Sequence, residues 1–187
     1  AVYLPPFYFA EIGTANGLLR LTREPAGDRL WTELARARLE TGNPDLSVDV
    51  SRIEELVHMT YDGAQAEAIR LAACSKVMIL TGGPGTGKTT VTRGIIAAFR
   101  AGGLRILLAA PTGRAAKRMT EATGLPAKTI HRLLEFKPPE GYQKNEDHPL
   151  EGDVLIVDEC SMIDLVLMNS LLKAIPSHMR LILVGDI

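Results

Sequence analysis

Residues 82–89, GGPGTGKT, carry the strongest chemical signal in the chain. They fit the spacing G-x-x-x-x-G-K-[ST], in which glycines let the backbone curl so that N–H groups point at phosphate oxygens. We expect Lys88 to reach the β- and γ-phosphates of a nucleotide and the Thr89 hydroxyl to ligate Mg²⁺. A glycine-rich turn without nucleotide is the alternative. The predicted loop residues are Gly83, Pro84, Gly85, Thr86, Gly87, Lys88, Thr89 and Thr90.

Two adjacent carboxylates, Asp158 and Glu159, follow the apolar residues 154–157. Such a run predicts a buried strand, and ligands of α/β sheets bind at the carboxyl ends of strands. We expect Asp158 to hold Mg²⁺ through water and Glu159 to act as general base on an attacking water. With Lys88 they form the predicted catalytic set. A strand end with two solvated acids is the alternative.

A basic segment lies between two acidic ones. Net charge is −1, but residues 88–132 hold nine Lys or Arg against one acid, Glu121. Within this segment Thr112 is the expected N-cap of a helix over 113–123. A hydroxyl and cations at a helix N-terminus suit a nucleic-acid phosphate, whereas charges balanced on a surface helix are the alternative. Ala115, Ala116 and Met119 are expected to face the sheet, and Arg114, Lys117 and Arg118 to face outward.

The segment 129–134, TIHRLL, offers two more polar side chains beside apolar ones. Thr129 and His131 are candidates for contacts with DNA phosphate or sugar. A buried, hydrogen-bonded histidine is the other interpretation of His131, and the segment alone does not decide between them.

The elements that must position these residues alternate between strands and helices. Helices are expected over 63–74, 88–101, 113–123 and 165–175, and strands in 76–83, 104–110, 153–158 and 180–184. This order predicts an α/β fold with a parallel sheet covered on both faces. Before it, residues 29–40 predict a helix closed by Gly42 and Pro44, and Ile53, Leu56, Val57 and Tyr61 predict one helix face capped by Asp49 or Ser51. Residues 137–152 are expected to form a polar loop.

Composition narrows the class of protein. No stretch approaches the roughly 20 apolar residues of a membrane span, and the N-terminus, AVYLPPFYFAEIG, lacks the basic start of a signal peptide. The two cysteines, Cys74 and Cys160, give neither a disulfide framework nor a metal-ligand spacing. These features predict a cytoplasmic protein without a membrane partner.

An ordered set of motifs resembles superfamily 1 DNA helicases, and among them the RecD/TraA type, including exodeoxyribonuclease V alpha subunits. The set is Gln65, GGPGTGKTT, LLAAPTGRAAKRM, KTIHRLL, DVLIVDECSM and LILVGD. The resemblance implies that Gln65 recognises adenine and that Asp186 belongs to a motif sensing the γ-phosphate. It implies that single-stranded DNA contacts Thr112, Gly113, Arg114, Lys117, Thr129 and His131.

The resemblance also implies an architecture and an activity. Residues 61–187 are expected to form a first RecA-like P-loop ATPase domain, preceded by a helical lead-in over 1–60. The implied activity is ATP- and Mg²⁺-dependent DNA translocation from 5′ to 3′, in recombination and repair, with a second RecA-like domain of the same chain and other subunits of a recombination nuclease as partners. Since 181–187, LILVGDI, end inside a motif, we expect this chain alone to hydrolyse ATP barely and not to unwind DNA.

Two other functions remain open at this stage. A P-loop ATPase that remodels a protein client would share the nucleotide motifs but would not bind single-stranded DNA. A non-catalytic assembly module would use its P-loop only to stabilise the fold.

Overall fold

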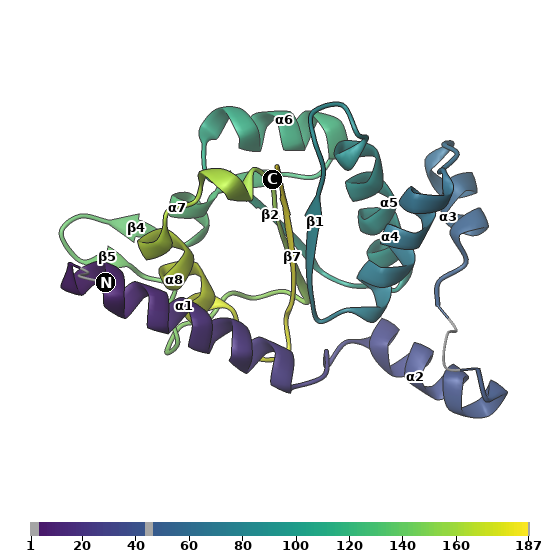
Figure 1. Ribbon diagram of the computed structural model, residues 1–187, viewed down its shortest axis with the longest axis horizontal. Coiled ribbons are helices and arrows are strands. Elements are labelled where there is room, and N and C mark those ends of the chain that lie inside the picture. The colour runs from purple at the N-terminus through teal and green to yellow at the C-terminus, as the bar shows by residue number, and fades with distance from the viewer. Residues whose placement is uncertain (1–3, 44–46, 187) are drawn as a thin grey trace.

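The computed structural model describes residues 4–43 and 47–186. Within them the main sheet has five parallel strands in the order β1-β7-β6-β2-β3, as Figure 1 shows. The strands are β1 (Val77–Thr81), β2 (Ile106–Ala110), β3 (Ala127–Thr129), β6 (Val154–Val157) and β7 (Arg180–Gly185). The predicted α/β fold with a parallel sheet is confirmed.

Helices cover both faces of this sheet. Side chains alternate along each strand, so that in β6 Ile156 belongs to one core and Leu155 and Val157 to the other. The first core lies under α4 (Gly63–Cys74), α5 (Lys88–Ala101) and α6 (Gly113–Thr123). The second lies under α8 (Leu165–Ala174) and α7 (Ile130–Leu133), with α1 (Pro5–Arg23) outside α8. These helices confirm the predicted ones within a residue or two at each end.

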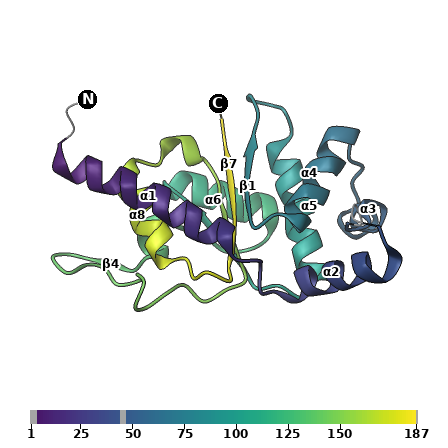
Figure 2. The same cartoon turned by 60° about the horizontal axis from the view of Figure 1, so that its bottom comes forward.

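The lead-in residues form helices that pack onto the rest of the chain. Figure 1 and Figure 2 both show α1 lying along α8. Glycines permit this approach, since a Cβ on Gly17 would lie 2.9 Å from Leu172 Cβ. Helix α2 (Arg29–Thr41) begins at the N-cap Asp28 and ends at Gly42, which has φ 66°. The predicted closing residue Pro44 lies outside the described residues.

The predicted helix face over 53–61 is partly wrong. Helix α3 spans Val50–Val57, with Asp49 as its N-cap, and ends because His58 adopts φ 52°. Tyr61 therefore lies in the connection to α4, where its N–H donates to Glu54 Oε1 at 2.7 Å. Leu56, predicted to be on the buried face, is 57% exposed.

The predicted polar loop over 137–152 also needs correction. Strands β4 (Phe136–Lys137) and β5 (Gly141–Tyr142) form a small antiparallel hairpin that starts before it. The hairpin projects beside α7 in Figure 1. Left-handed backbone occurs at Glu135 (φ 54°), just before β4, and at Gly141 (φ 84°), the first residue of β5.

A buried ion pair ties the lead-in to the sheet. Arg180, at the start of β7, is 0% exposed, and its guanidinium donates to both carboxylate oxygens of Asp28, at 2.6 and 3.0 Å. The same guanidinium donates to the Ala73 carbonyl at 2.7 Å. It lies 5.3 Å from the ring centre of Trp31 and 5.4 Å from that of Phe99. We call these contacts the Arg180 clamp.

Lys76 lies next to the clamp and makes stability depend on pH. Its Nζ donates to the Ser177 carbonyl at 2.5 Å, and burial, followed by the nearby Arg180, lowers the pKa of Lys76 to about 8. As pH rises from about 8 towards the ordinary lysine value, the unfolded state holds more protons than the folded state, so this group's contribution to stability rises. Urea unfolding at pH 8.0 to 9.5 should show wild type gaining stability relative to Lys76→Met.

The matched control is Lys173→Met, which removes an exposed lysine of α8. Its stability difference from wild type should not change across the same pH range. A Lys76→Met difference that is equally flat would contradict the prediction.

Strand β1 stands at one edge of the sheet. Among the described residues it pairs with β7 alone. Ile79, in the middle of this strand, is 67% exposed. No helix in the described part of the chain is both long and apolar enough to cross a membrane.

Candidate nucleotide site and nucleic-acid interface

The sequence-predicted residues gather at one edge of the sheet. All strands of the main sheet are parallel, so their carboxyl ends lie together. The loop 82–89 follows β1, Asp186 follows β7 and Asp158 follows β6, and these three strands are neighbours. Thr112 lies just after β2, and Thr129 is the last residue of β3. Both threonines therefore lie on the other half of the edge. The edge therefore has a nucleotide half and a second half with the proposed DNA residues.

The loop 82–89 has the backbone of a phosphate cradle. Gly85 and Gly87 have φ 77° and 81°, which an L side chain rarely adopts. Gly87 is the N-cap of α5 and makes no side-chain capping bond, so the first N–H groups of α5 remain available to an anion. A Cβ on Gly82 would lie 2.6 Å from Thr86 Oγ1. The loop 82–89 therefore fits the phosphates of a nucleoside triphosphate.

Lys88 is held by groups that a nucleotide would replace. Its Nζ donates to the carbonyls of Gly82 and Gly83 at 2.5 and 2.9 Å. It also pairs with Asp186 Oδ1 at 2.6 Å. Asp186 thus lies beside the loop, as expected of a residue near the γ-phosphate, and neutralises the lysine.

Removing this carboxylate should strengthen nucleotide binding. Asp186→Asn keeps the size of the side chain but removes the charge that competes with phosphate for Lys88. Since the pair is partly exposed, we expect ADP affinity to rise by only about twofold to fivefold, the effect of a fraction of a kcal/mol to about one. Titration of a fluorescent ADP analogue checks this. The control is Asp147→Asn, which makes the same change at an exposed residue between β5 and β6. Weaker binding by Asp186→Asn would contradict it.

The paired carboxylates stand on a constrained turn. The Asp158 N–H donates to the Ala109 carbonyl of the neighbouring strand, and Asp158 Oδ1 accepts from the Glu159 N–H, both at 2.9 Å. Glu159 adopts φ 55°, a left-handed conformation that is uncommon outside glycine. The following Cys160 donates its thiol to the Val157 carbonyl at 3.1 Å, and burial raises the pKa of this thiol to about 12. Cys160 is therefore a structural group beside the site.

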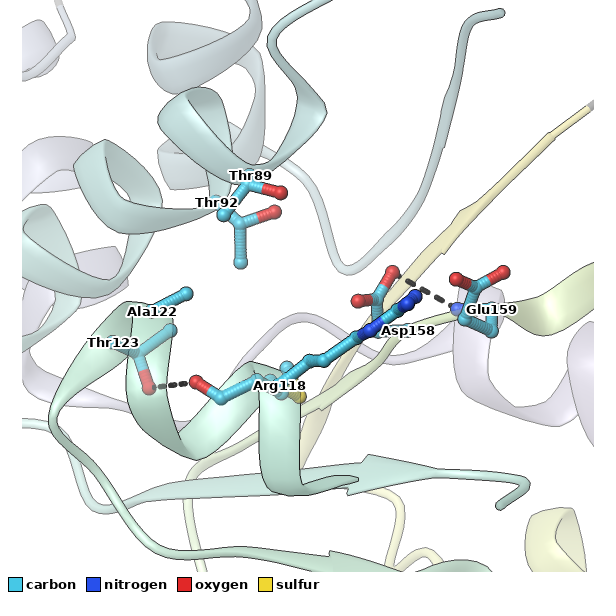
Figure 3. Close-up of a pocket in the computed structure, with 8 residues that line it drawn as sticks. Thr89, Thr92, Arg118, Ala122, Thr123, Asp158 and Glu159 are labelled. Carbon is cyan, nitrogen blue, oxygen red and sulfur yellow. Dashed lines mark hydrogen bonds between the residues drawn. The ribbon is translucent and has the colours of Figure 1, made fainter. Parts of the chain in front are cut away.

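A cavity of about 180 Å³ lies between α5, α6 and the end of β6. Figure 3 shows Thr89 and Thr92 above it, and Asp158 and Glu159 at one side. The proposed Mg²⁺ ligands Thr89 and Asp158 thus face the same space. No three His, Cys, Asp or Glu side chains converge on a metal position within 4–43 and 47–186, so a Mg²⁺ ion held here would need phosphate and water oxygens as well.

The cavity also includes residues that were not predicted to belong to the nucleotide site. These are Thr92, Arg118, Met119, Ala122 and Thr123. Arg118 is exposed, as predicted, together with Arg114 and Lys117. Its long side chain also extends along the cavity toward the two carboxylates (Figure 3).

Gln65 lies against the loop and has a second task. The side-chain Oε1 of Gln65 accepts from the Asp62 N–H at 3.2 Å, and the backbone N–H of Gln65 donates to Asp62 Oδ1 at 2.8 Å. These two bonds form a capping box that starts α4. A Cβ on Gly87 would lie 2.7 Å from Gln65 Nε2. The side chain is thus near the loop, and its adenine contact stays a prediction.

The proposed DNA residues flank two helix starts. Thr112 Oγ1 accepts from the Ala115 N–H and Thr129 Oγ1 from the Arg132 N–H, each at 3.2 Å, which confirms Thr112 as an N-cap. A Cβ on Gly113 would meet no heavy atom within 4 Å. Ala115, Ala116 and Met119 are buried, as predicted, and Arg114 and Lys117 are exposed.

His131 is exposed, so the buried-histidine interpretation is wrong. Its ring lies 5.8 Å from those of Phe136 and Tyr142, which are 5.0 Å apart. The β4–β5 hairpin therefore adds two aromatic rings to this half of the edge. We call His131, Phe136 and Tyr142 the aromatic cluster.

The fold and the loop geometry define a P-loop NTPase domain of the RecA-like type. A family model described as AAA domain matches residues 65–187, and the chain belongs to this family. A solved structure of Pif1 helicases at forked double-stranded DNA has a TM-score of 0.52 and 21% identity, over 68% of this chain and 34% of that one. At this identity the likeness concerns the fold alone.

Curated relatives confirm the resemblance to RecD-type helicases. The ATP-dependent RecD2 DNA helicase of Deinococcus radiodurans is 38% identical, over 97% of this chain and 26% of that protein. The RecBCD enzyme subunit RecD of Mycobacterium tuberculosis is also 38% identical, over 85% of this chain and 32% of that protein. The chain thus spans about a quarter to a third of the length of these relatives.

Proposed function

We propose that this chain is an ATP-hydrolysing motor domain of a DNA helicase that moves along single-stranded DNA from 5′ to 3′, in recombination and repair. The observation that carries this proposal is the division of one sheet edge. A nucleotide cradle follows β1, β7 and β6, and exposed cations and aromatic rings follow β2 and β3. The RecD-type relatives support the same activity.

The chain's own residues have separable tasks in hydrolysis. The backbone of Gly85 and Gly87 and the α5 N-terminus would hold the phosphates of ATP, and Lys88 would leave Asp186 to bind them. Thr89 and Asp158 would hold Mg²⁺, which supplies charge neutralisation at the phosphates. Glu159 would accept the proton of the attacking water. Gln65 would contact adenine.

The aromatic cluster favours single-stranded DNA over a protein client. Unpaired bases stack on aromatic rings whatever their sequence, and nearby cations bind the backbone. Phe136 is 46% exposed, and Arg114 and Lys117 are exposed at the start of α6. We assign Thr112, Gly113 and Thr129 to the phosphate contacts of the same strand.

DNA-stimulated ATPase activity tests the proposal, measured on the protein at its full natural length. Arg114→Gln and Lys117→Gln should weaken single-stranded DNA binding in a salt-dependent manner. Arg100→Gln, an exposed arginine of α5 outside the site, should leave binding unchanged. ATP hydrolysis that DNA does not stimulate would favour the protein-remodelling alternative, and an absence of hydrolysis would favour the assembly module.

The proposed domains and partners of the whole protein rest on the same relatives. We propose a helical lead-in over 1–60 and a RecA-like ATPase domain over 61–187, completed by a second RecA-like domain for full turnover. Subunits of a recombination nuclease are the proposed partners, since several relatives are RecBCD subunits. The free thiols of Cys74 and Cys160 support a cytoplasmic location.

A further inference from the structure

Arg118 belongs to the same helix as the proposed DNA contacts but reaches the hydrolysis site. Helix α6 begins at its N-cap Thr112, beside Arg114. Arg118 follows about one turn later and lines the cavity with Asp158 and Glu159. Figure 3 shows its side chain directed from α6 toward these two carboxylates. One rigid element thus connects the two halves of the sheet edge.

Two carboxylates share the cavity with this cation, and no ion pair joins Arg118 to either of them within the described residues. A guanidinium is always charged and presents a planar fork of donors that matches a carboxylate. Asp158 Oδ1 already accepts from the Glu159 N–H, and the proposed task of Asp158 is to hold Mg²⁺. The Glu159 carboxylate accepts no hydrogen bond from any residue within 4–43 and 47–186. Its backbone is fixed at φ 55° while its side chain is not held.

We propose that Arg118 is a positioning residue that orients the Glu159 carboxylate, and that it links the DNA-bound state of α6 to ATP hydrolysis. This inference rests on the proposed function. Movement of α6 when its N-terminus binds DNA shifts the guanidinium within the cavity, which changes the orientation of the general base. Misplacing a catalytic group by about 1 Å costs on the order of 10²-fold in rate, so a small shift of α6 is sufficient.

The test compares Arg118→Gln, Arg118→Lys and the control Arg100→Gln in the protein at its full natural length. ATPase kcat and KM are measured with and without saturating oligo-dT, and oligo-dT affinity is measured by fluorescence anisotropy. Arg118→Gln should lower kcat in the presence of DNA by about tenfold or more, with KM and DNA affinity within about twofold of wild type. Arg118→Lys should recover part of kcat, because it keeps the charge but loses the fork.

Three outcomes would overturn the inference: an unchanged kcat, a kcat restored by more DNA, or a parallel rise in KM. If Arg118→Gln does not fold, Arg118→Lys decides, since wild-type kcat in that variant would overturn the inference and a reduced kcat at unchanged KM would support it. A wild-type ATPase that DNA does not stimulate would instead refute the proposed function. The two failures are therefore distinguishable.

Discussion

Replacing Glu159 by glutamine should lower the ATP turnover number of the full-length protein by about 10²–10⁴-fold, the typical contribution of a general base. Glutamine has nearly the same shape and can occupy the same backbone conformation at φ 55°, but its amide cannot accept the proton of the attacking water. Lys88 and the loop 82–89 are unchanged, so the affinity for ADP should stay within about twofold of wild type. Steady-state ATPase assays and ADP titration measure the two effects separately.

Glu151→Gln is the matched control, because it makes the same chemical change at an exposed residue just before β6. It should keep wild-type turnover. If Glu159→Gln retained more than half of wild-type turnover, another group would have to be the base. If it lost ADP binding as well, the defect would lie in the fold of the site rather than in proton transfer.

Asp28→Ala should lower the free energy of unfolding by about 3–5 kcal/mol, which is the cost of leaving a buried charge without its partner. Arg180 is 0% exposed, and Asp28 supplies both of its carboxylate contacts. Asp28 Oδ1 also accepts from the Trp31 N–H at 2.8 Å and so caps α2. Urea unfolding measures the loss, and the fluorescence of Trp31, the one tryptophan in the sequence, reports it from within the Arg180 clamp.

Two further variants separate the causes. Asp28→Asn keeps an oxygen for the cap but removes the charge, so it should still show most of the loss. Glu40→Ala breaks an exposed ion pair with Arg36 at 2.7 Å and should cost only about 0.2–1 kcal/mol. Equal losses for Asp28→Ala and Glu40→Ala would mean that the Arg180 clamp contributes no more than a surface pair.

The placement of the residues proposed to bind nucleotide was predictable because their signals are local. The spacing in 82–89 and the carboxylates after the apolar residues 154–157 each fix a strand, a turn and a set of side chains in one short segment. Capping residues such as Asp49 and Thr112 were predictable for the same reason. Parallel strands then bring these segments to one edge without further information.

What the sequence did not predict depends on contacts between distant segments. Asp28 and Arg180 are separated by 152 positions, and neither stands out from its neighbours in the chain. Arg118 is exposed as predicted, but its place along the cavity with Asp158 and Glu159 was not predicted, because helical periodicity describes the Cβ direction and not the reach of a long side chain. The aromatic neighbours of His131 were not predicted, because they come from a hairpin whose strands have two residues each, too short to produce an alternating pattern.

The outer position of β1 has a practical consequence for handling the protein. A strand with unpaired N–H and C=O groups on one side can template pairing with another chain, and an exposed isoleucine such as Ile79 strengthens that tendency. Native edge strands are commonly protected by a charge, a proline or a covering element, and Val77–Thr81 contains neither charge nor proline. Preparations of this chain should therefore be kept dilute, since self-association through this strand would remove monomer from solution while leaving the nucleotide loop beside it folded.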